Sequence, residues 1–204
     1  MPVSEKTFRQ VALEDPEGHW ELFCGFMRRK PGMSIEHNQV MSDLHITLGQ
    51  QLDRNQFAVR SNAGHVRHTA QSYYIPDVFV IPVELQRPLW GRRGLEWYEA
   101  PLPLVVEIWS ASTGDYDIEI KLLEYQRRGD LEIWRIHPYD RTLTAWRRQP
   151  DGSYNESVYT GGVVNPIALP NVTIDLDRPF TYQATGVPKD AAARRASRAD
   201  RPSP

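Results

Sequence analysis

Two acidic residues stand in stretches whose other residues predict burial. Glu107 lies inside the apolar, β-branched stretch 103–109, which begins among prolines and is typical of a buried strand. Asp77 directly follows a proline inside a second hydrophobic stretch, residues 73–82. Because proline is tolerated at the start of a strand, we expect Asp77 to lie where this strand enters the sheet. Both acids are therefore candidates for a buried site.

A lysine follows on the next predicted helix. Residues 112–115 have the pattern of a capping box, with a serine three residues before an acid, and Gly129 predicts the end of the helix near Arg128. Four residues share one stripe of this helix at spacings of three and four, namely Ile118, Lys121, Leu122 and Tyr125. We therefore expect the Lys121 side chain to point toward the sheet.

Burying these charges is costly unless they meet one another, a metal ion or a ligand. Two carboxylates on neighbouring strands offer hard oxygen ligands that suit a hydrated Mg²⁺ ion, and a nearby ammonium can orient an attacking water or stabilise a pentacovalent phosphate. Asp77, Glu107 and Lys121 therefore suit metal-assisted hydrolysis of a phosphodiester. Two simpler interpretations remain open: a structural ion pair between Glu107 and Lys121, and an Asx-type turn at Asp77.

The order of these motifs resembles the Uma family of putative restriction endonucleases, within the PD-(D/E)XK nuclease superfamily. The resemblance covers most of the chain, and its motifs are residues 20–25, 76–78, 105–107 and 110–113, Asp117, Lys121, residues 125–134 and the hairpin at 151–154. It implies an α/β (α+β) fold with a restriction-endonuclease-like core, in which helices flank a central mixed β-sheet. It also implies that Asp77 and Glu107 bind the metal and that Lys121 is the catalytic lysine.

The activity implied by the resemblance is that of a Mg²⁺-dependent endonuclease, with Mn²⁺ as an alternative ion, that hydrolyses DNA through a metal-activated water. The sequence departs from the superfamily in one place, because Trp109 stands two residues after Glu107, where the strand usually carries a lysine. A helix can deliver an ammonium to the same point in space as a neighbouring strand, so Lys121 takes that role in this interpretation.

The composition bounds the class of protein. With 204 residues, of which 40% are hydrophobic, the chain can bury one sizeable core, and we expect a single nuclease domain over residues 1–183. Residues 184–204 have almost no large apolar side chain and predict a disordered C-terminal tail. The formal net charge of −2 argues against a protein that coats nucleic acid non-specifically.

The sequence also bears on localisation. It has no continuous apolar stretch of ~18 residues and no basic-then-apolar N-terminus, so we expect neither a membrane span nor a signal peptide. The single cysteine, Cys24, cannot form an internal disulfide, which favours the cytoplasm, and we expect it to be a small buried side chain. Local basic clusters that could contact phosphate, or simply be solvated, lie at residues 27–30, 92–93, 127–128 and 147–148.

The remaining patterns predict the elements around this site. They are strands at residues 20–27, 57–60 and 131–136, a helix from Ser34 with Val40, Leu44, Leu48 and Leu52 along one side, and a hairpin of residues 142–148 and 153–159. Residues 61–72 and 84–103 are interpreted as loops, because they are polar or rich in turn residues. His37 and His45 are interpreted as ordinary polar residues, or at most substrate contacts, because no second ligand stands at metal-site spacing.

Two other classes of function remain open. The chain could be a catalytically weak or inactive nuclease-fold protein that binds nucleic acid or regulates another process. Alternatively, it could be a protein-interaction module that uses the predicted loop around Trp90 and Trp97. A homodimer is also open, because two symmetry-related active sites serve the two strands of a duplex.

Overall fold

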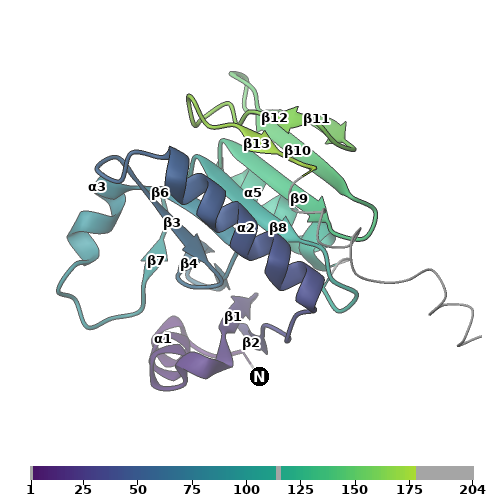
Figure 1. Cartoon of the computed structure of the whole chain (residues 1–204). Helices are drawn as coiled ribbons and strands as arrows, with labels where there is room; N and C mark the ends of the chain where they lie inside the picture. The colour runs from purple at the N-terminus through teal and green to yellow at the C-terminus, as the bar shows by residue number, and fades with distance from the viewer. Residues whose placement is uncertain (1, 114–115, 178–204) are drawn as a thin grey trace, which may run out of the picture.

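A six-stranded mixed sheet forms the centre of the computed structural model, which describes residues 2–113 and 116–177. Its strands follow the order β11-β10-β9-β8-β6-β3 (Figure 1). Their bounds are β3 Phe57–Ser61, β6 Val78–Pro82, β8 Leu104–Ile108, β9 Glu132–His137, β10 Thr142–Arg148 and β11 Tyr154–Tyr159. Strands β8 and β9 are parallel, and the other neighbouring pairs are antiparallel. The mixed sheet predicted from the sequence is confirmed.

A second, five-stranded sheet packs beside the first, with the order β2-β1-β5-β4-β7. Its strands are β1 Trp20–Phe23, β2 Phe26–Arg29, β4 His65–Thr69, β5 Ser72–Tyr74 and β7 Trp97–Tyr98. The prediction that residues 61–72 form a loop is therefore wrong. Short strands with polar residues show no clear apolar alternation in the sequence. Here β4 pairs with β5, and β5 pairs with β1, so pairing rather than the local pattern determines the strand conformation. A third, two-stranded sheet joins β12 Val163–Val164 to β13 Ile174–Asp175.

Two helices cover opposite faces of the large sheet (Figure 1). Helix α2 (Ile35–Gln51) begins after Ser34, whose hydroxyl accepts a hydrogen bond from the His37 N–H at 3.2 Å. On the other face, a π-helical segment, η3 (Asp117–Leu122), continues into α5 (Leu123–Arg128). Gly129 ends α5 in the left-handed conformation at φ 80°, as the sequence predicts. The capping acid predicted at position 115 lies outside the described residues.

Side chains alternate between two hydrophobic clusters along β8. Leu104, Val106 and Ile108 pack on the α2 face, whereas Val105 packs with Tyr125 of α5 on the other face. Because successive residues of a strand point to opposite faces, Glu107 shares the α5 face with Val105. The pleat of β8 therefore directs Glu107 toward the helix that carries Lys121.

The remaining helices are short or lie at the edge. Helix α1 (Glu5–Glu14) precedes β1, and η1 (Pro16–Gly18) lies between them. Residues 84–103 are not all loop, because α3 (Val83–Gln86) and η2 (Arg87–Leu89) precede β7 within or beside this stretch. That prediction is wrong because each element is too short to show a period.

Three further expectations concern the ends and turns of the chain. Cys24 is exposed rather than buried, because it occupies the β1–β2 turn with φ 48°. The tail predicted at residues 184–204 lies outside the described residues. Within residues 2–113 and 116–177, no helix has the length and apolar character needed to cross a bilayer.

Candidate active site

Asp77 lies at the point where the chain leaves the five-stranded sheet and enters the six-stranded sheet. It follows β5 and immediately precedes β6, and the antiparallel register of β6 with β8 pairs Val78 with Val106. Continuing this register by one residue sets Asp77 opposite Glu107. Like charges directly opposite one another on neighbouring strands repel. The two predicted acids are therefore brought together, at a place where each needs compensation.

Asp77 is almost fully buried and accepts hydrogen bonds on both carboxylate oxygens. Lys30 Nζ donates to Oδ1 at 2.8 Å, and the Ile108 N–H donates to Oδ2 at 2.6 Å. His37 Nε2 lies 3.0 Å from the same Oδ2. Burial alone raises the pKa of Asp77, but Lys30 and His37 outweigh it and hold that pKa well below its usual value. Asp77 is therefore an ionised carboxylate, not the local Asx turn.

Glu107 is equally buried but has fewer donors. Its Oε1 accepts a hydrogen bond from Tyr125 Oη at 2.5 Å and lies 3.2 Å from Lys121 Nζ. Burial raises the pKa of Glu107 to about 8, and the nearby carboxylates of Asp117 and Asp77 add to this rise, while Lys121 opposes it. The surroundings push the pKa values of these two acids apart. Pairs of this kind are often found in active sites, where one acid exchanges a proton.

Lys121 points into the sheet, as the stripe of the predicted helix indicates, and only 2% of the residue is exposed. Besides Glu107, its ammonium lies 2.9 Å from Glu21 Oε1 and 3.6 Å from Asp117 Oδ1. Burial lowers the pKa of Lys121, but Glu107, Glu21 and Asp117 together raise it well above its usual value, so the ammonium stays charged. The Glu107–Lys121 pair is thus one contact of a larger network, rather than an isolated ion pair.

The π-helical segment places Asp117 and Lys121 on the same side of one wide turn. Single π-helical turns are rare and are frequent at functional sites. The Asp117 N–H donates to the Thr113 carbonyl at 2.8 Å, which ties this turn to the end of β8 through the loop between them. Sequence reasoning predicts an α-helix here, because a π turn has no recognised sequence signature.

Four residues of this network were not predicted as site residues: Glu21, Lys30, His37 and Asp117. Glu21, on β1, accepts a hydrogen bond from the Ile75 N–H at 2.9 Å, while Lys30 also donates to the Ile75 carbonyl at 2.8 Å. The interpretation of His37 as an ordinary polar residue is wrong, since it is 1% exposed and bonded to Asp77. Glu21 could have been recognised from the sequence, because it is an acid inside a predicted strand. Lys30 could not, because it belongs to a basic cluster of the kind usually found on the protein surface.

The charges of this network do not balance. Four buried acids, Glu21, Asp77, Glu107 and Asp117, share two ammonium groups, those of Lys30 and Lys121, and the raised pKa of Glu107 lets a proton offset part of the difference in the metal-free protein. Within the described residues, no three His, Cys, Asp or Glu side chains are arranged to hold a metal ion by themselves. Mg²⁺ is commonly bound by one or two carboxylates, with water and substrate phosphate completing its shell. The opposed pair Asp77 and Glu107 fits that donor set once Glu107 has released its proton, as metal binding requires.

The mixed sheet, with helices on both faces and two opposed acids on neighbouring strands, is a restriction-endonuclease-like core. The sequence pattern of the Uma2 family, described as "Putative restriction endonuclease", matches residues 6–177, and the chain belongs to this family. The resemblance noted in the sequence is confirmed.

The fold is also similar to a solved structure, the crystal structure of "a putative nuclease belonging to DUF820" from Anabaena variabilis ATCC 29413. The TM-score is 0.71 and the sequence identity 16%, over 89% of this chain and 99% of that chain. At this identity, the likeness concerns the fold alone. A comparison with curated proteins finds no match. Membership of the Uma2 family supports a nuclease role.

Proposed function

We propose that the protein is a Mg²⁺-dependent endonuclease that hydrolyses phosphodiester bonds of DNA. The observation that carries this proposal is the register of β6 and β8, which, continued by one residue, sets Asp77 opposite Glu107, whose Oε1 lies 3.2 Å from the Lys121 ammonium. Membership of a family described as restriction endonucleases supports a nucleic-acid substrate. Glu21, Asp117 and the two lysines extend the network beyond what a single structural ion pair requires.

The proposed metal ligands are Asp77 and Glu107, and the ion, when bound, supplies a Lewis acid for a phosphate oxygen and a water of lowered pKa. Lys30, which follows β2, and His37, in the first turn of α2, hold the Asp77 carboxylate in place by hydrogen bonds. Tyr125 holds Glu107 from the α5 side. The Lys121 ammonium, 3.2 Å from Glu107, is placed to stabilise negative charge that develops on a phosphate beside the two acids.

Cleavage of supercoiled plasmid with Mg²⁺ or Mn²⁺ tests this function. We expect metal-dependent nicking by the wild type and none by Glu107→Gln. Lys121→Met keeps the length of the side chain and removes its charge, so we expect the nicking rate to fall by about 100-fold or more. Lys6→Met, which changes an exposed lysine of α1, is the matched control and is expected to nick like the wild type.

Four results would count against the proposal. Nicking that persists in EDTA would exclude a role for the metal, and nicking that persists in Glu107→Gln would exclude Glu107. Equal losses of metal affinity and of nicking rate in Lys121→Met would indicate a structural ion pair. DNA binding by the wild type without cleavage of plasmid or of single-stranded DNA in either metal would favour the inactive nuclease-fold alternative.

A further inference from the structure

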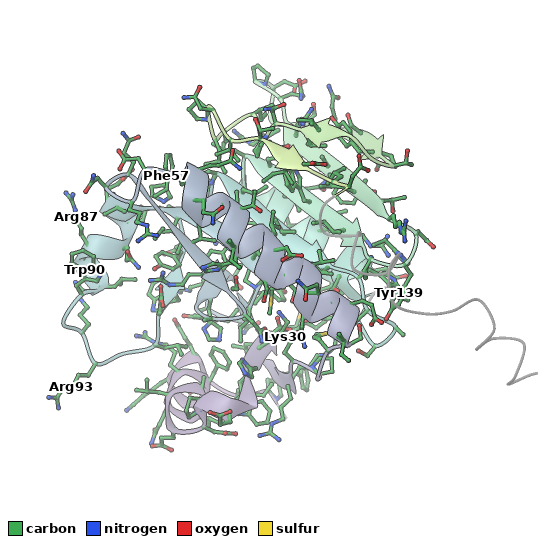
Figure 2. The ribbon with its side chains drawn as sticks, in the orientation of Figure 1. Lys30, Phe57, Arg87, Trp90, Arg93 and Tyr139 are labelled. Carbon is green, nitrogen blue, oxygen red and sulfur yellow. The ribbon has the colours of Figure 1, made fainter. Side chains whose placement is uncertain are left out.

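The segment from Glu84 to Trp97, called the arm below, carries positive charge with few partners. Three of its arginines, Arg87, Arg92 and Arg93, are exposed, and it has only two acids, Glu84 and Glu96. Within the part of the chain that the structure describes, no side-chain hydrogen bond or ion pair engages these three guanidinium groups. Figure 2 shows Arg87, Trp90 and Arg93 along one outer edge of the molecule.

A cavity of about 400 Å³ lies under the arm, with aromatic rings and guanidinium groups in its wall. Trp90, Trp97 and Tyr98 contribute the rings. The negative charge of Glu96 in this wall is already paired, because Arg60 Nε donates to Glu96 Oε1 at 3.0 Å. Arg9, whose guanidinium lies 5.7 Å from the Trp97 ring centroid, and Arg92 then give the wall a net positive charge.

Trp90 is 66% exposed, although burial of an indole is favourable. The turn around it is well defined, because its N–H donates to the Arg87 carbonyl at 3.2 Å and Gly91 follows with φ 76°. A single exposed aromatic residue is ordinary on a protein surface. An exposed indole between unpaired guanidinium groups is the combination that binds an unpaired nucleic-acid strand, where bases stack on rings and phosphates meet cations.

A second cavity, of about 250 Å³, adjoins the first and is lined in part by residues that contact Asp77 and Lys30. It shares Gly94, Leu95 and Glu96 with the first cavity, and its wall continues to Asn62 and Ile75. The Asn62 N–H donates to the Asp77 carbonyl at 2.9 Å, and the Ile75 carbonyl accepts from Lys30. The two cavities thus lie in sequence from the arm to residues that contact Asp77 and Lys30.

We propose that the arm and the two cavities bind an unpaired stretch of nucleic-acid strand, with Trp90 stacking on a base and Arg92 and Arg93 contacting phosphates. This inference rests on the proposed nuclease function for the identity of the ligand. The second cavity gives such a strand a path from the arm to Asn62 and Ile75, which contact Asp77 and Lys30. A duplex presents its bases only at the groove edges, so it cannot use Trp90 in this way.

Fluorescence anisotropy of a labelled oligonucleotide, in EDTA so that no cleavage intervenes, tests the inference. We expect the full chain to bind a single strand more tightly than the matching duplex. Trp90→Ala should weaken binding of the single strand about tenfold and leave duplex binding unchanged. The double variant Arg92→Gln/Arg93→Gln should lower the slope of log affinity against log salt by about 1.4. Arg141→Gln, at an exposed arginine outside the arm and outside the basic clusters of the sequence, is the control and should bind like the wild type.

The inference is overturned if the arm variants bind the single strand as tightly as the wild type does. It is also overturned if polyglutamate competes as well as single-stranded DNA, because the arm would then be a surface for acidic proteins. The outcomes separate this inference from the nuclease proposal. If the wild type nicks plasmid and the arm variants bind the single strand as it does, only the proposal of strand binding by the arm is contradicted. If binding depends on Trp90 but no nicking occurs, only the proposal of nuclease activity is contradicted.

Discussion

At the scale of residues, the candidate site contrasts two similar acids in different surroundings. Asp77 accepts from Lys30 and Ile108 and lies beside His37, so its pKa is lowered, whereas burial and neighbouring acids raise the pKa of Glu107 to about 8. The acids were predictable from the sequence because each interrupts an apolar stretch. Lys30 and His37 were not, because their roles depend on contacts with Asp77 across 47 and 40 residues of chain.

The same contrast predicts different effects of two amide substitutions on the metal-free protein at pH 7. Asp77→Asn leaves the buried Lys30 ammonium without its counter-charge, and we expect a loss of about 3–5 kcal/mol in the free energy of unfolding. Glu107→Gln resembles the protonated acid that predominates below pH 8, so we expect a much smaller loss. Urea unfolding of both variants measures the difference, and equal losses would contradict the assigned charge states.

A buried histidine away from the acids predicts a pH dependence of stability. His65 is 5% exposed, and burial lowers its pKa, although hydrogen bonds to the Trp20 and Glu96 carbonyls oppose this. The unfolded chain therefore binds a proton near pH 6.5 that the folded chain does not. The stabilisation is present above pH 6.5 and is lost as the pH falls through the lowered folded pKa.

We expect the free energy of unfolding to fall between pH 7.5 and 5.5 by more in the wild type than in His65→Gln. The difference in slope reaches at most about 1.4 kcal/mol per pH unit, the value for one proton. Urea unfolding at four pH values in this range measures it. Parallel curves for the two proteins would show that His65 titrates alike in both states.

At the scale of elements, long and strongly patterned segments were predictable and short ones were not. Helix α2 and the hairpin of β10 and β11 follow from periodic apolar residues and a turn signal. Strands β4 and β5 and helix α3 have three to five residues each, so tertiary pairing decides their conformation. The π-helical turn is likewise set by packing, although the position of Lys121 on it was predictable from spacing.

Two glycines provide a matched test of the helix ends. Gly129 terminates α5 with φ 80°, and nothing lies within 3.6 Å of an added Cβ, so the cost of Gly129→Ala is that of a left-handed backbone, about 1–2 kcal/mol. Gly49 lies within α2 with open space around it, so Gly49→Ala should stabilise by about 0.5–1 kcal/mol. Thermal unfolding measures both shifts, and shifts of the same sign would contradict this account of the helices.

At the scale of the whole molecule, the candidate site lies at the junction of the five-stranded and six-stranded sheets. Glu21 comes from the five-stranded sheet, Glu107 from the six-stranded sheet, and Asp77 from the chain that passes between them. A buried arginine also joins the two sheets: Arg128, at the end of α5, donates to Asp130, which precedes β9, and to the Tyr98 carbonyl of β7. Arg128 thus serves the fold, and this residue of the predicted basic cluster at 127–128 is not available to phosphate.

Binding of Mg²⁺ to the purified protein, followed by titration calorimetry and repeated with Mn²⁺, tests the central claim most directly. Glu107→Gln keeps the volume of the side chain, and Glu84→Gln, at an exposed acid of α3, is the matched control. We predict binding by the wild type and by Glu84→Gln, and loss of binding in Glu107→Gln while circular dichroism stays unchanged. A wild type that binds neither ion, or a folded Glu107→Gln that binds as the wild type does, would contradict a metal site at Asp77 and Glu107.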